Sequence, residues 1–285
     1  MTGPYAEVIG DPVAQSKSPQ IHRHWLRSLG LDGDYRARTV TPTGLEDYFA
    51  MAQSDAEWRG CNVTMPLKQA VEPFVDRVEP AARRIGAINT IHRAADGALV
   101  GRNTDGAGFL EPLSKHLKKP HYFRMARILG TGGAARAIAT ALDRENVVLV
   151  IAGRTRARAQ AFLDSLALEG EHHVAALTDF EAPTDFAFDD REGCFDLVVN
   201  ATPLGMRGQD ELAFDWSHAP PGAIAYDIVT DPLRTRFLER AAEHGHATID
   251  GLAMLIGQAA AAFPRFFGVA PPRGNDAALR KALTA

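Results

Sequence analysis

A glycine-rich turn and the strand after it have the residue types and the spacing to bind a dinucleotide. The turn, Gly130–Ala135, follows an apolar strand at Arg127–Leu129, and a second strand at Val147–Ile151 leads to Arg154. Such glycines allow a tight turn, a close approach of the backbone to a pyrophosphate and close packing of a helix whose N-terminus faces that anion. Arg154 lies near the ~20-residue spacing expected for the residue that contacts the ribose.

Basic side chains follow the second strand, where NAD-binding proteins usually carry an acidic residue that bonds the ribose 2′-hydroxyl. They are Arg154, Arg156 and Arg158. Guanidinium groups suit a 2′-phosphate. The sequence therefore predicts an NADP site, and the alternative is an ordinary tight turn with surface arginines.

A nicotinamide enzyme that acts on an alcohol also needs a group that exchanges the hydroxyl proton. Lys68 follows a predicted strand at Glu57–Val63, and Asp105 follows a predicted hairpin strand at Ala98–Val100. A carboxylate beside a lysine can hold its ammonium group in place. We therefore predict that Lys68 and Asp105 form a proton-transfer pair. The alternatives are a solvated lysine and a helix-capping aspartate.

The elements that position these residues alternate between strands and helices. In the first half, strands are predicted at Tyr5–Ile9, Tyr35–Val40, Glu57–Val63 and Ala87–His92, which indicates βαβ units and a mostly parallel sheet. The helix signals are Ser18 as N-cap with Gly30 as C-terminal stop, a capping box at Thr43–Glu46, and a helix over 104–117 after a hairpin turn at Asp96-Gly97.

The second half predicts a doubly wound sheet. The glycine turn leads into a helix at Ala134–Leu142, and later helices are expected at Thr155–Leu168 and Leu233–His244. Strands are expected at His173–Ala176, Phe195–Asn200, Ala223–Asp227 and Ala247–Ile249. The apolar segment Gly251–Phe267 is expected to be buried.

The fold class is therefore α/β, with an N-terminal α/β substrate domain, a Rossmann-type NADP-binding domain and a C-terminal helix that returns to the substrate domain. We assign residues 1–105 and 250–285 to the substrate-binding and catalytic domain, and residues 106–249 to the dinucleotide-binding domain. Because the substrate and cofactor motifs are split in this way, we expect the two domains to open and close around their ligands.

Composition narrows the class of partner. The chain has 285 residues and a formal net charge of −4, which disfavours binding to nucleic acid or to an anionic membrane and favours a small-molecule substrate. Cys61 and Cys194 lack metal-type spacing, and no metal site is predicted. The first residues do not read as a signal peptide, so a cytoplasmic location is expected, as a monomer or a homodimer.

Over almost its whole length the chain resembles the shikimate dehydrogenase family. Several separated motifs carry the resemblance, in the family's order: Ile9–Pro12, Ser16–Pro19, Gly60–Lys68, Gly86–Thr90, Asn103–Gly106, Gly130–Ala135, Arg154–Thr155, Val199–Pro203, Tyr226–Asp227 and Asp250–Gln258. The resemblance implies NADP-dependent interconversion of shikimate and 3-dehydroshikimate in aromatic amino acid biosynthesis.

The resemblance also implies roles for individual residues. Lys68 and Asp105 are similar to the catalytic pair, with Lys68 passing the proton to or from the reacting oxygen. Ser16 and Ser18 resemble the serines that bind the substrate carboxylate, with Tyr226 nearby. The positions that hold ring hydroxyls match Asn62, Thr64, Asn89, Asp105 and Gln258.

On the cofactor side, the resemblance implies that Gly130, Gly132, Gly133 and Ala134 form the pyrophosphate turn. Arg154, Thr155 and Arg158 would bind the adenosine end with its 2′-phosphate, and Thr202, Gly251 and Met254 would lie near the nicotinamide half.

Two features bear on specificity. Gly153 replaces the asparagine that usually precedes the Arg-Thr pair, which leaves the preference for NADP over NAD open. Quinate-using relatives often carry threonine at the second serine position, so Ser18 favours shikimate. The alternatives are a quinate/shikimate dehydrogenase, a paralogue that acts on a related cyclohexane carboxylate, and a catalytically silent binding protein.

Overall fold

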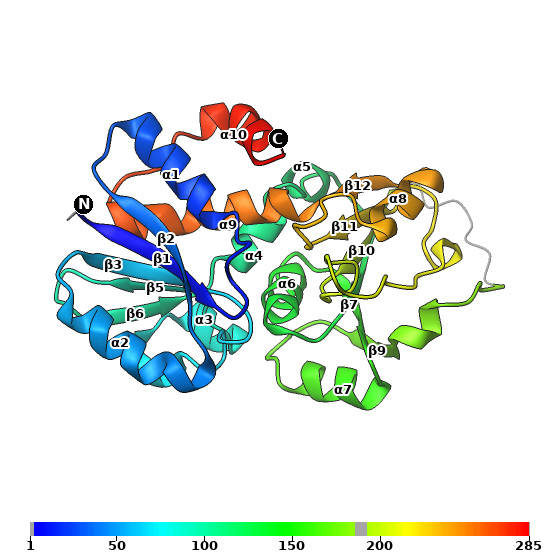
Figure 1. Cartoon of the computed structure of the whole chain (residues 1–285). Coiled ribbons are helices and arrows are strands. Elements are labelled where there is room, and N and C mark those ends of the chain that lie inside the picture. Colours follow the sequence, from blue (N-terminus) through cyan, green and yellow to red (C-terminus); the bar gives the residue numbers. More distant parts are fainter. Residues whose placement is uncertain (1–2, 186–192, 285) are drawn as a thin grey trace. The chain divides into compact units, whose positions relative to one another are not determined.

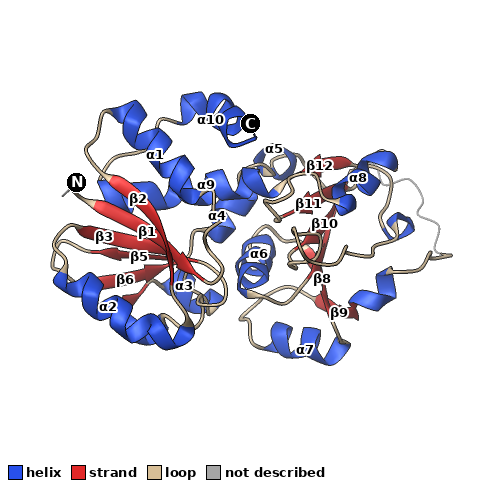
Figure 2. Ribbon diagram, viewed as in Figure 1, coloured by secondary structure: helices blue, strands red, loops and turns tan. Residues whose placement is uncertain are grey.

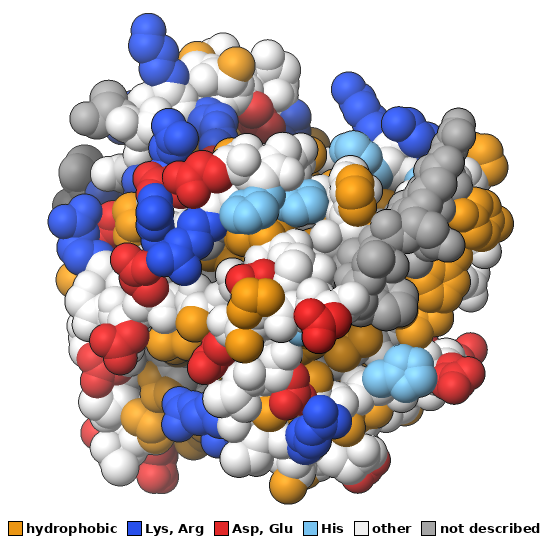
Figure 3. Space-filling view, turned by 90° about the vertical axis from the view of Figure 1, so that its right-hand side faces the viewer, with side chains coloured by type: hydrophobic (Ala, Val, Ile, Leu, Met, Phe, Trp, Pro, Cys, Tyr) orange, Lys and Arg blue, Asp and Glu red, His pale blue; other side chains and the backbone are white. Residues whose placement is uncertain are grey.

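The computed structural model describes residues 3–185 and 193–284. The chain divides into two compact units, of which unit 1 comprises Met1–Gly108 and Ile256–Ala285 and unit 2 comprises Phe109–Leu255 (Figures 1 and 2). Within the described residues, no helix has the length and apolar character needed to cross a membrane. Acidic and basic side chains are interspersed on the face drawn in Figure 3.

Unit 1 is built on a mixed six-stranded sheet. Its strands are β1 (Tyr5–Gly10), β2 (Asp34–Thr39), β3 (Trp58–Val63), β4 (Arg77–Val78), β5 (Thr90–Arg93) and β6 (Leu99–Arg102). The strand order is β2-β1-β3-β5-β6-β4. Strand β1 is parallel to β2 and β3, and β4 is parallel to β6, whereas β5 is antiparallel to both β3 and β6.

The predicted mostly parallel arrangement holds for β1 to β3 and for β4 with β6, and β5 is the antiparallel strand. A short turn joins β5 to β6, and its Gly97 has φ of 87°. A connection this short permits only antiparallel pairing, because parallel neighbours need a crossover of a dozen or more residues. The hairpin at Asp96-Gly97 is confirmed, and β5 begins at Thr90 rather than at Ala87.

Helices cover both faces of the unit 1 sheet (Figure 1). They are α1 (Ser18–Leu29), α2 (Leu45–Ser54), α3 (Pro80–Ile85), α4 (Asp105–Leu110), α9 (Gly251–Phe267) and α10 (Asp276–Thr284), with single 3₁₀ turns at Pro42–Gly44, Glu72–Phe74 and Arg273–Asn275. On one face Ala262 and Phe266 of α9 pack with Ala6, Val8 and Tyr35. On the other face Phe49 of α2 packs with Ile9 and Trp58. The alternation of side chains along each strand produces these two cores.

Two predicted helix starts are wrong. Ser18 is the first residue of α1 rather than its N-cap, and its backbone N–H donates to Oγ of Ser16 at 3.3 Å. The capping box at Thr43–Glu46 does not form, because Thr43 lies in the preceding 3₁₀ turn and α2 begins at Leu45. The predicted stop at Gly30 is confirmed, since this residue ends α1 with φ of 63°.

The helix predicted over 104–117 is two short helices, α4 and α5 (Ser114–Leu117). Pro112 lies between them and explains the break. Proline has no N–H for the helix ladder, and it disfavours helical backbone at the residue before it.

Unit 2 is built on a parallel six-stranded sheet. Its strands are β7 (Phe123–Leu129), β8 (Val148–Gly153), β9 (His172–Ala176), β10 (Cys194–Asn200), β11 (Ile224–Asp227) and β12 (Ala247–Ile249). Besides α5, its helices are α6 (Gly133–Asp143), α7 (Arg156–Asp164) and α8 (Arg236–Glu243). Single 3₁₀ turns lie at Leu177–Phe180 and Trp216–His218. The strand order is β12-β11-β10-β7-β8-β9, and every pair is parallel.

This strand order is that of the doubly wound dinucleotide-binding fold, 3-2-1-4-5-6, so the predicted fold class is confirmed. The direction of winding reverses between β7 and β10, and ligands of such sheets bind outside the carboxyl ends of the strands at that point. Neighbouring residues of β10 face different cores: Leu197 packs with Ile138 of α6, and Val198 packs with Phe237 of α8.

Candidate functional site

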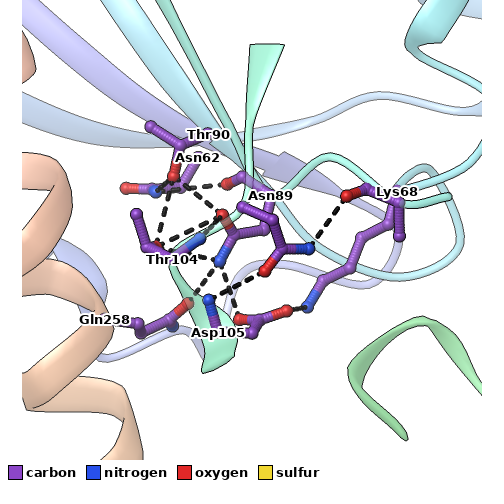
Figure 4. Close-up of polar contacts among 9 residues, drawn as sticks. Asn62, Lys68, Asn89, Thr90, Thr104, Asp105 and Gln258 are labelled. Carbon is purple, nitrogen blue, oxygen red and sulfur yellow. Dashed lines mark hydrogen bonds and ion pairs between the residues drawn. The ribbon is translucent and has the colours of Figure 1, made fainter. Parts of the chain in front are cut away.

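The side chains of Lys68 and Asp105 meet in unit 1 (Figure 4). Lys68 Nζ donates to Asp105 Oδ2 at 2.6 Å, and the side chains are 15% and 2% exposed, respectively. The carboxylate is thus almost fully buried, whereas the amine retains access to solvent. A charge-assisted hydrogen bond of this length holds the amine in one place.

Local backbone contacts explain how these two residues come together. Lys68 lies in the turns after β3, and its carbonyl accepts from the Ile88 N–H at 2.7 Å. Asp105 begins α4, and its N–H donates to Oδ1 of Asn103 at 3.0 Å. The side chain of Asn103 therefore caps the turn that carries Asp105, so the capping role lies with Asn103.

Asn89 is at the centre of the polar network around this pair. Its Nδ2 donates to Asp105 Oδ1 at 2.7 Å and lies 2.9 Å from Oε1 of Gln258 on α9. Its Oδ1 accepts from the backbone N–H of Thr104 at 2.8 Å. The amide therefore holds the carboxylate oxygen that Lys68 does not use, and it links the pair to Gln258.

Asn62 extends the same network. Its Nδ2 donates to the Asn89 carbonyl at 3.2 Å and to Thr90 Oγ1 at 2.9 Å, and its Oδ1 accepts from Tyr35 Oη at 2.6 Å. Both amide hydrogens of Asn62 are used inside unit 1, which leaves one lone pair of Oδ1 for any further partner. Burial raises the pKa of Tyr35 well above its usual value, so its phenol stays protonated.

The two serines lie at the start of α1. Ser16 is half-buried and its Oγ accepts from the Ser18 N–H, while Ser18 is buried. Between them, Lys17 Nζ donates to the carbonyl of Leu283 on α10 at 2.7 Å, which ties this segment to the last helix. Thr64 directly follows β3 and is half-buried.

The glycine turn of unit 2 has the geometry its sequence predicted. Gly130 has φ of 122°, and a Cβ there would lie 2.7 Å from the carbonyl oxygen of Ala201, so only glycine fits. Gly132 precedes α6 with φ of −88°, and a Cβ there would meet nothing within 4 Å among the described residues. The first helical bond of α6 runs from Arg136 N–H to the Gly132 carbonyl, so the N–H groups before Arg136 have no acceptor in the helix.

The basic segment after β8 is exposed. Among the described residues, Arg154 has no hydrogen bond or ion pair. Thr155 caps α7 by accepting from the Arg158 N–H, and Arg158 Nε donates to Thr131 Oγ1 of the glycine turn at 3.2 Å. Arg156 instead pairs with Asp179 at 2.7 Å.

Packing explains why residue 153 is a glycine. A Cβ at this position would lie 3.0 Å from the carbonyl oxygen of Thr155 and 3.1 Å from the N atom of Ala159. Glycine therefore lets the start of α7 approach β8 closely.

The remaining predicted cofactor residues lie near the ends of β10 and β12. Thr202 Oγ1 donates to Asn200 Oδ1 at 2.7 Å, and Asn200 Nδ2 donates to Asp227, whose pKa burial raises. Gly251 begins α9, and a Cβ there would lie 2.4 Å from the Val229 carbonyl oxygen. Met254 is buried in the unit 2 core.

Tyr226 packs inside unit 2. Its ring stacks on Phe109 with centroids 4.6 Å apart, the residue is fully buried, and its hydroxyl has no partner in the part of the chain that the structure describes. Burial raises its pKa. The prediction that Tyr226 binds the substrate stays a prediction, and its hydroxyl is the group that would do so.

Sequence reasoning missed Tyr35, Thr90 and Thr104, all buried and all bonded to Asn62 or Asn89. Thr90 and Thr104 stand directly beside residues that the motifs did single out, which was the available signal. Within residues 3–185 and 193–284, no group of three or more His, Cys, Asp or Glu side chains could hold a metal ion.

Comparisons with known proteins identify similar chains. A family model described as the shikimate dehydrogenase substrate binding domain matches residues 8–91. The shikimate dehydrogenase (NADP(+)) of Sphingopyxis alaskensis is 47% identical over 283 residues, which cover 99% of this chain and 97% of that protein.

Two solved structures share the fold. A shikimate 5-dehydrogenase from Thermus thermophilus, in complex with NADP(H) and shikimate, matches with a TM-score of 0.81 and 36% identity over 98% of this chain and 99% of that chain. A quinate dehydrogenase from Corynebacterium glutamicum, in complex with NAD, matches with a TM-score of 0.80 and 29% identity over 98% and 99% of the two chains.

Proposed function

The chain belongs to the shikimate dehydrogenase family, and from that premise we propose that it is an NADP-dependent oxidoreductase that interconverts shikimate and 3-dehydroshikimate. The observation that carries this proposal is the 2.6 Å contact between Lys68 Nζ and Asp105. It supports a proton-transfer pair that a polar network holds in place.

Lys68 exchanges the proton of the reacting oxygen. In the oxidation direction the amine takes the proton of the substrate hydroxyl, and in the reduction direction the ammonium returns it. Asp105 holds Nζ, and Asn89 holds the other carboxylate oxygen, so the amine needs little reorganisation before it acts. The partial exposure of Lys68 leaves its amine accessible to a substrate.

Hydroxyl and amide groups of unit 1 bind the substrate. Ser16 and Ser18 hold the carboxylate through hydroxyl donors, and Asn62, Thr64 and Gln258 hold the ring hydroxyls through their remaining donors and acceptors. Asn89 takes part through the amide that faces Asp105 and Gln258. Gln258 supports this role through its place beside Asn89 at 2.9 Å.

The residues of unit 2 fit a dinucleotide. The free N–H groups at the start of α6 and the open space at Gly132 suit a pyrophosphate, and the exposed Arg154 suits a 2′-phosphate. Thr155 and Arg158 follow the carboxyl end of β8, and Thr202 follows that of β10. When bound, NADP supplies the hydride acceptor for oxidation and NADPH supplies the donor for reduction.

A second candidate function is the oxidation of quinate. The likeness to a quinate dehydrogenase structure favours it, whereas Ser18 favours shikimate. An assay of reduced-nicotinamide absorbance with shikimate, quinate and aminoshikimate, each with NADP and NAD, separates the candidates. We expect the highest kcat/KM with shikimate and NADP. A higher value with quinate would establish the second candidate, and binding without turnover would establish a silent binding protein.

We further propose a cytoplasmic location and a monomeric or homodimeric state. Cys61 and Cys194 are both free thiols, which fits a reducing compartment. Cell fractionation and sedimentation equilibrium test these two points.

A further inference from the structure

Two buried hydroxyl groups, those of Thr90 and Tyr35, contact the amide side chains of the site. Figure 4 shows Thr90 beside Asn62 and Asn89. Thr90 Oγ1 lies 2.9 Å from both Asn62 Nδ2 and Asn89 Oδ1. Tyr35 Oη lies 2.6 Å from Asn62 Oδ1. Tyr35 and Thr90 are both fully buried. A chain of hydrogen bonds thus runs from Tyr35 through Asn62, Thr90 and Asn89 to Asp105.

Groups at the Asp105 end of this chain fix the orientation of the Asn89 amide. The Asp105 carboxylate can only accept, so Asn89 Nδ2 faces it, and the Thr104 N–H can only donate, so Asn89 Oδ1 faces that. The Thr90 hydroxyl, which also lies against Asn89 Oδ1, must therefore donate to it.

The other end fixes the same direction independently. The backbone carbonyl of Asn89 can only accept, so Asn62 turns its Nδ2 toward it and toward Thr90. Asn62 Oδ1 then faces Tyr35, whose hydroxyl must donate. Both ends require hydrogen bonds to be donated in the same direction along the chain. The whole chain of hydrogen bonds therefore has one arrangement of donors and acceptors.

The ring of Tyr35 has little freedom to move. It stacks on His22 with centroids 3.9 Å apart and planes 7° apart, and it also contacts Phe266 of α9. Packing of the unit 1 core therefore fixes the position of the tyrosine hydroxyl.

We infer that Tyr35 and Thr90 are positioning residues for the reaction. Their hydroxyls donate to the amide oxygens of Asn62 and Asn89 and reinforce the orientation in which the Asn89 NH₂ faces Asp105 and Gln258. Through Asp105 this orientation holds Lys68. This inference rests on the proposed function, because it assigns the purpose of the network to the proton-transfer pair.

Single-group substitutions test it. Thr90→Val and Tyr35→Phe remove one hydroxyl each, and Thr90→Ser restores the donor. The controls are Thr140→Val, a buried threonine of unit 2 whose hydroxyl has no partner among the described residues, and Tyr48→Phe, a buried tyrosine that bonds Glu7 on the opposite face of the sheet. Steady-state kinetics with shikimate and NADP, and thermal melting, are measured for each variant.

We expect Thr90→Val and Tyr35→Phe to lower kcat by about tenfold with a smaller change in KM, since misalignment affects the reacting geometry. Thr90→Ser should stay within about twofold of the parent. The controls should keep the kcat of the parent, whether or not their melting temperatures change. Equal losses of kcat in controls and test variants, or a parent-like kcat in both test variants, would overturn the inference.

A double variant distinguishes a connected chain from two separate packing effects. Tyr35→Phe combined with Thr90→Val should lose little more kcat than Thr90→Val alone, because residues in one hydrogen-bond network are not additive. A loss of kcat in the double variant that equals the product of the two single losses would contradict a connected chain of hydrogen bonds. If Thr90→Val does not fold, Tyr35→Phe and Thr90→Ser carry the test by the same criteria.

Hydrogen exchange of the Asn89 side-chain NH₂, followed by NMR without substrate, separates failure of this inference from failure of the proposed function. Faster exchange in Tyr35→Phe and Thr90→Val than in the two controls supports the positioning role whatever the substrate is. Unchanged exchange overturns it even if the parent oxidises shikimate.

Discussion

At the scale of single residues, the site depends on pairing a reactive group with others that cannot move. Lys68 meets a carboxylate that is 2% exposed, and Asn89 holds the second oxygen of that carboxylate. Buried polar groups in a fully bonded network have one low-energy arrangement. The chemistry expected of Lys68 therefore depends on neighbours that never touch it.

Lys68→Ala should lower kcat by about a hundredfold or more with a much smaller change in KM, which is the effect of losing a general acid–base group. Lys118→Ala, at an exposed lysine, is the matched control. Turnover near that of the parent in Lys68→Ala would remove this residue from the proton-transfer role.

Arg154→Ala should weaken NADP binding far more than NAD binding, because only NADP carries the additional phosphate. Arg156→Ala serves as the control, since Arg156 is already paired with Asp179. Dissociation constants for both cofactors, measured by fluorescence titration, decide the point. Equal losses for NADP and NAD would contradict the role of Arg154.

At the scale of elements, the proposed function assigns cofactor binding to the start of α6 and the loop before it. Two glycines there serve different purposes. Gly130 is required by the fold, because a side chain would collide with Ala201. Gly132 meets no such obstacle from the described part of the protein, and under the proposed function glycine at this position leaves room for the pyrophosphate.

Gly132→Ala should weaken NADP binding by about tenfold or more, on the order of 1.4 kcal/mol, while costing about 1 kcal/mol or less of folding stability. Gly130→Ala should cost roughly 3 kcal/mol of stability, from backbone strain and collision. Urea unfolding and cofactor titration measure both effects. A Gly132→Ala protein that binds NADP as the parent does would show that the pyrophosphate lies elsewhere.

The packing of α1 against the unit 1 sheet predicts sensitivity to acid. Burial lowers the pKa of His22 to about 3, below the ~6.5 of an unfolded histidine. Between these values the unfolded chain binds the proton and the folded chain does not, so the stability is fully present above about pH 6.5 and is lost as the pH falls toward about 3.

His22→Phe should therefore reduce the loss of unfolding free energy between pH 7 and pH 5 by about 2 kcal/mol. Both the parent and the variant still lose some unfolding free energy as the pH falls, because burial also lowers the pKa values of His92, His121 and His246. His24→Phe, at a half-buried histidine of the same helix, is the control. Identical pH dependence in His22→Phe and the parent would contradict this account.

At the scale of the whole molecule, the proposed function assigns binding of the two ligands to different units. The polar network with Lys68 lies in unit 1, and the glycine turn with Arg154 lies in unit 2. Each unit has its own sheet and its own buried core. Substitutions in one site should therefore leave the other site folded.

NADP at about a hundred times its dissociation constant should stabilise the native chain by about 2.7 kcal/mol. In Gly132→Ala, at the same concentration of NADP, this stabilisation should fall, while the stabilisation by shikimate should be retained. Thermal melting with each ligand tests this. Loss of stabilisation by both ligands would mean that the binding sites do not fold independently.

Much of this protein follows from local sequence signals. The glycine turn, the strands around it and the stop of α1 at Gly30 depend on backbone freedom and on side-chain periodicity, which are properties of short segments. The parallel strands of unit 2 follow from repeated strand–helix units, because each parallel pair needs a crossover. Lys68 and Asp105 were identifiable because each follows a predicted strand.

Tertiary structure alone decided how these pieces meet. Asn89 contacts Gln258 across 169 positions of the chain, and Tyr35 contacts Asn62 through a side chain that reads as ordinary core in the sequence. The pairing of β5 with β3 and the burial of Tyr226 likewise depend on which neighbours are present. A hydrogen bond or a packed ring needs a specific partner in space, and no local property of either residue specifies that partner.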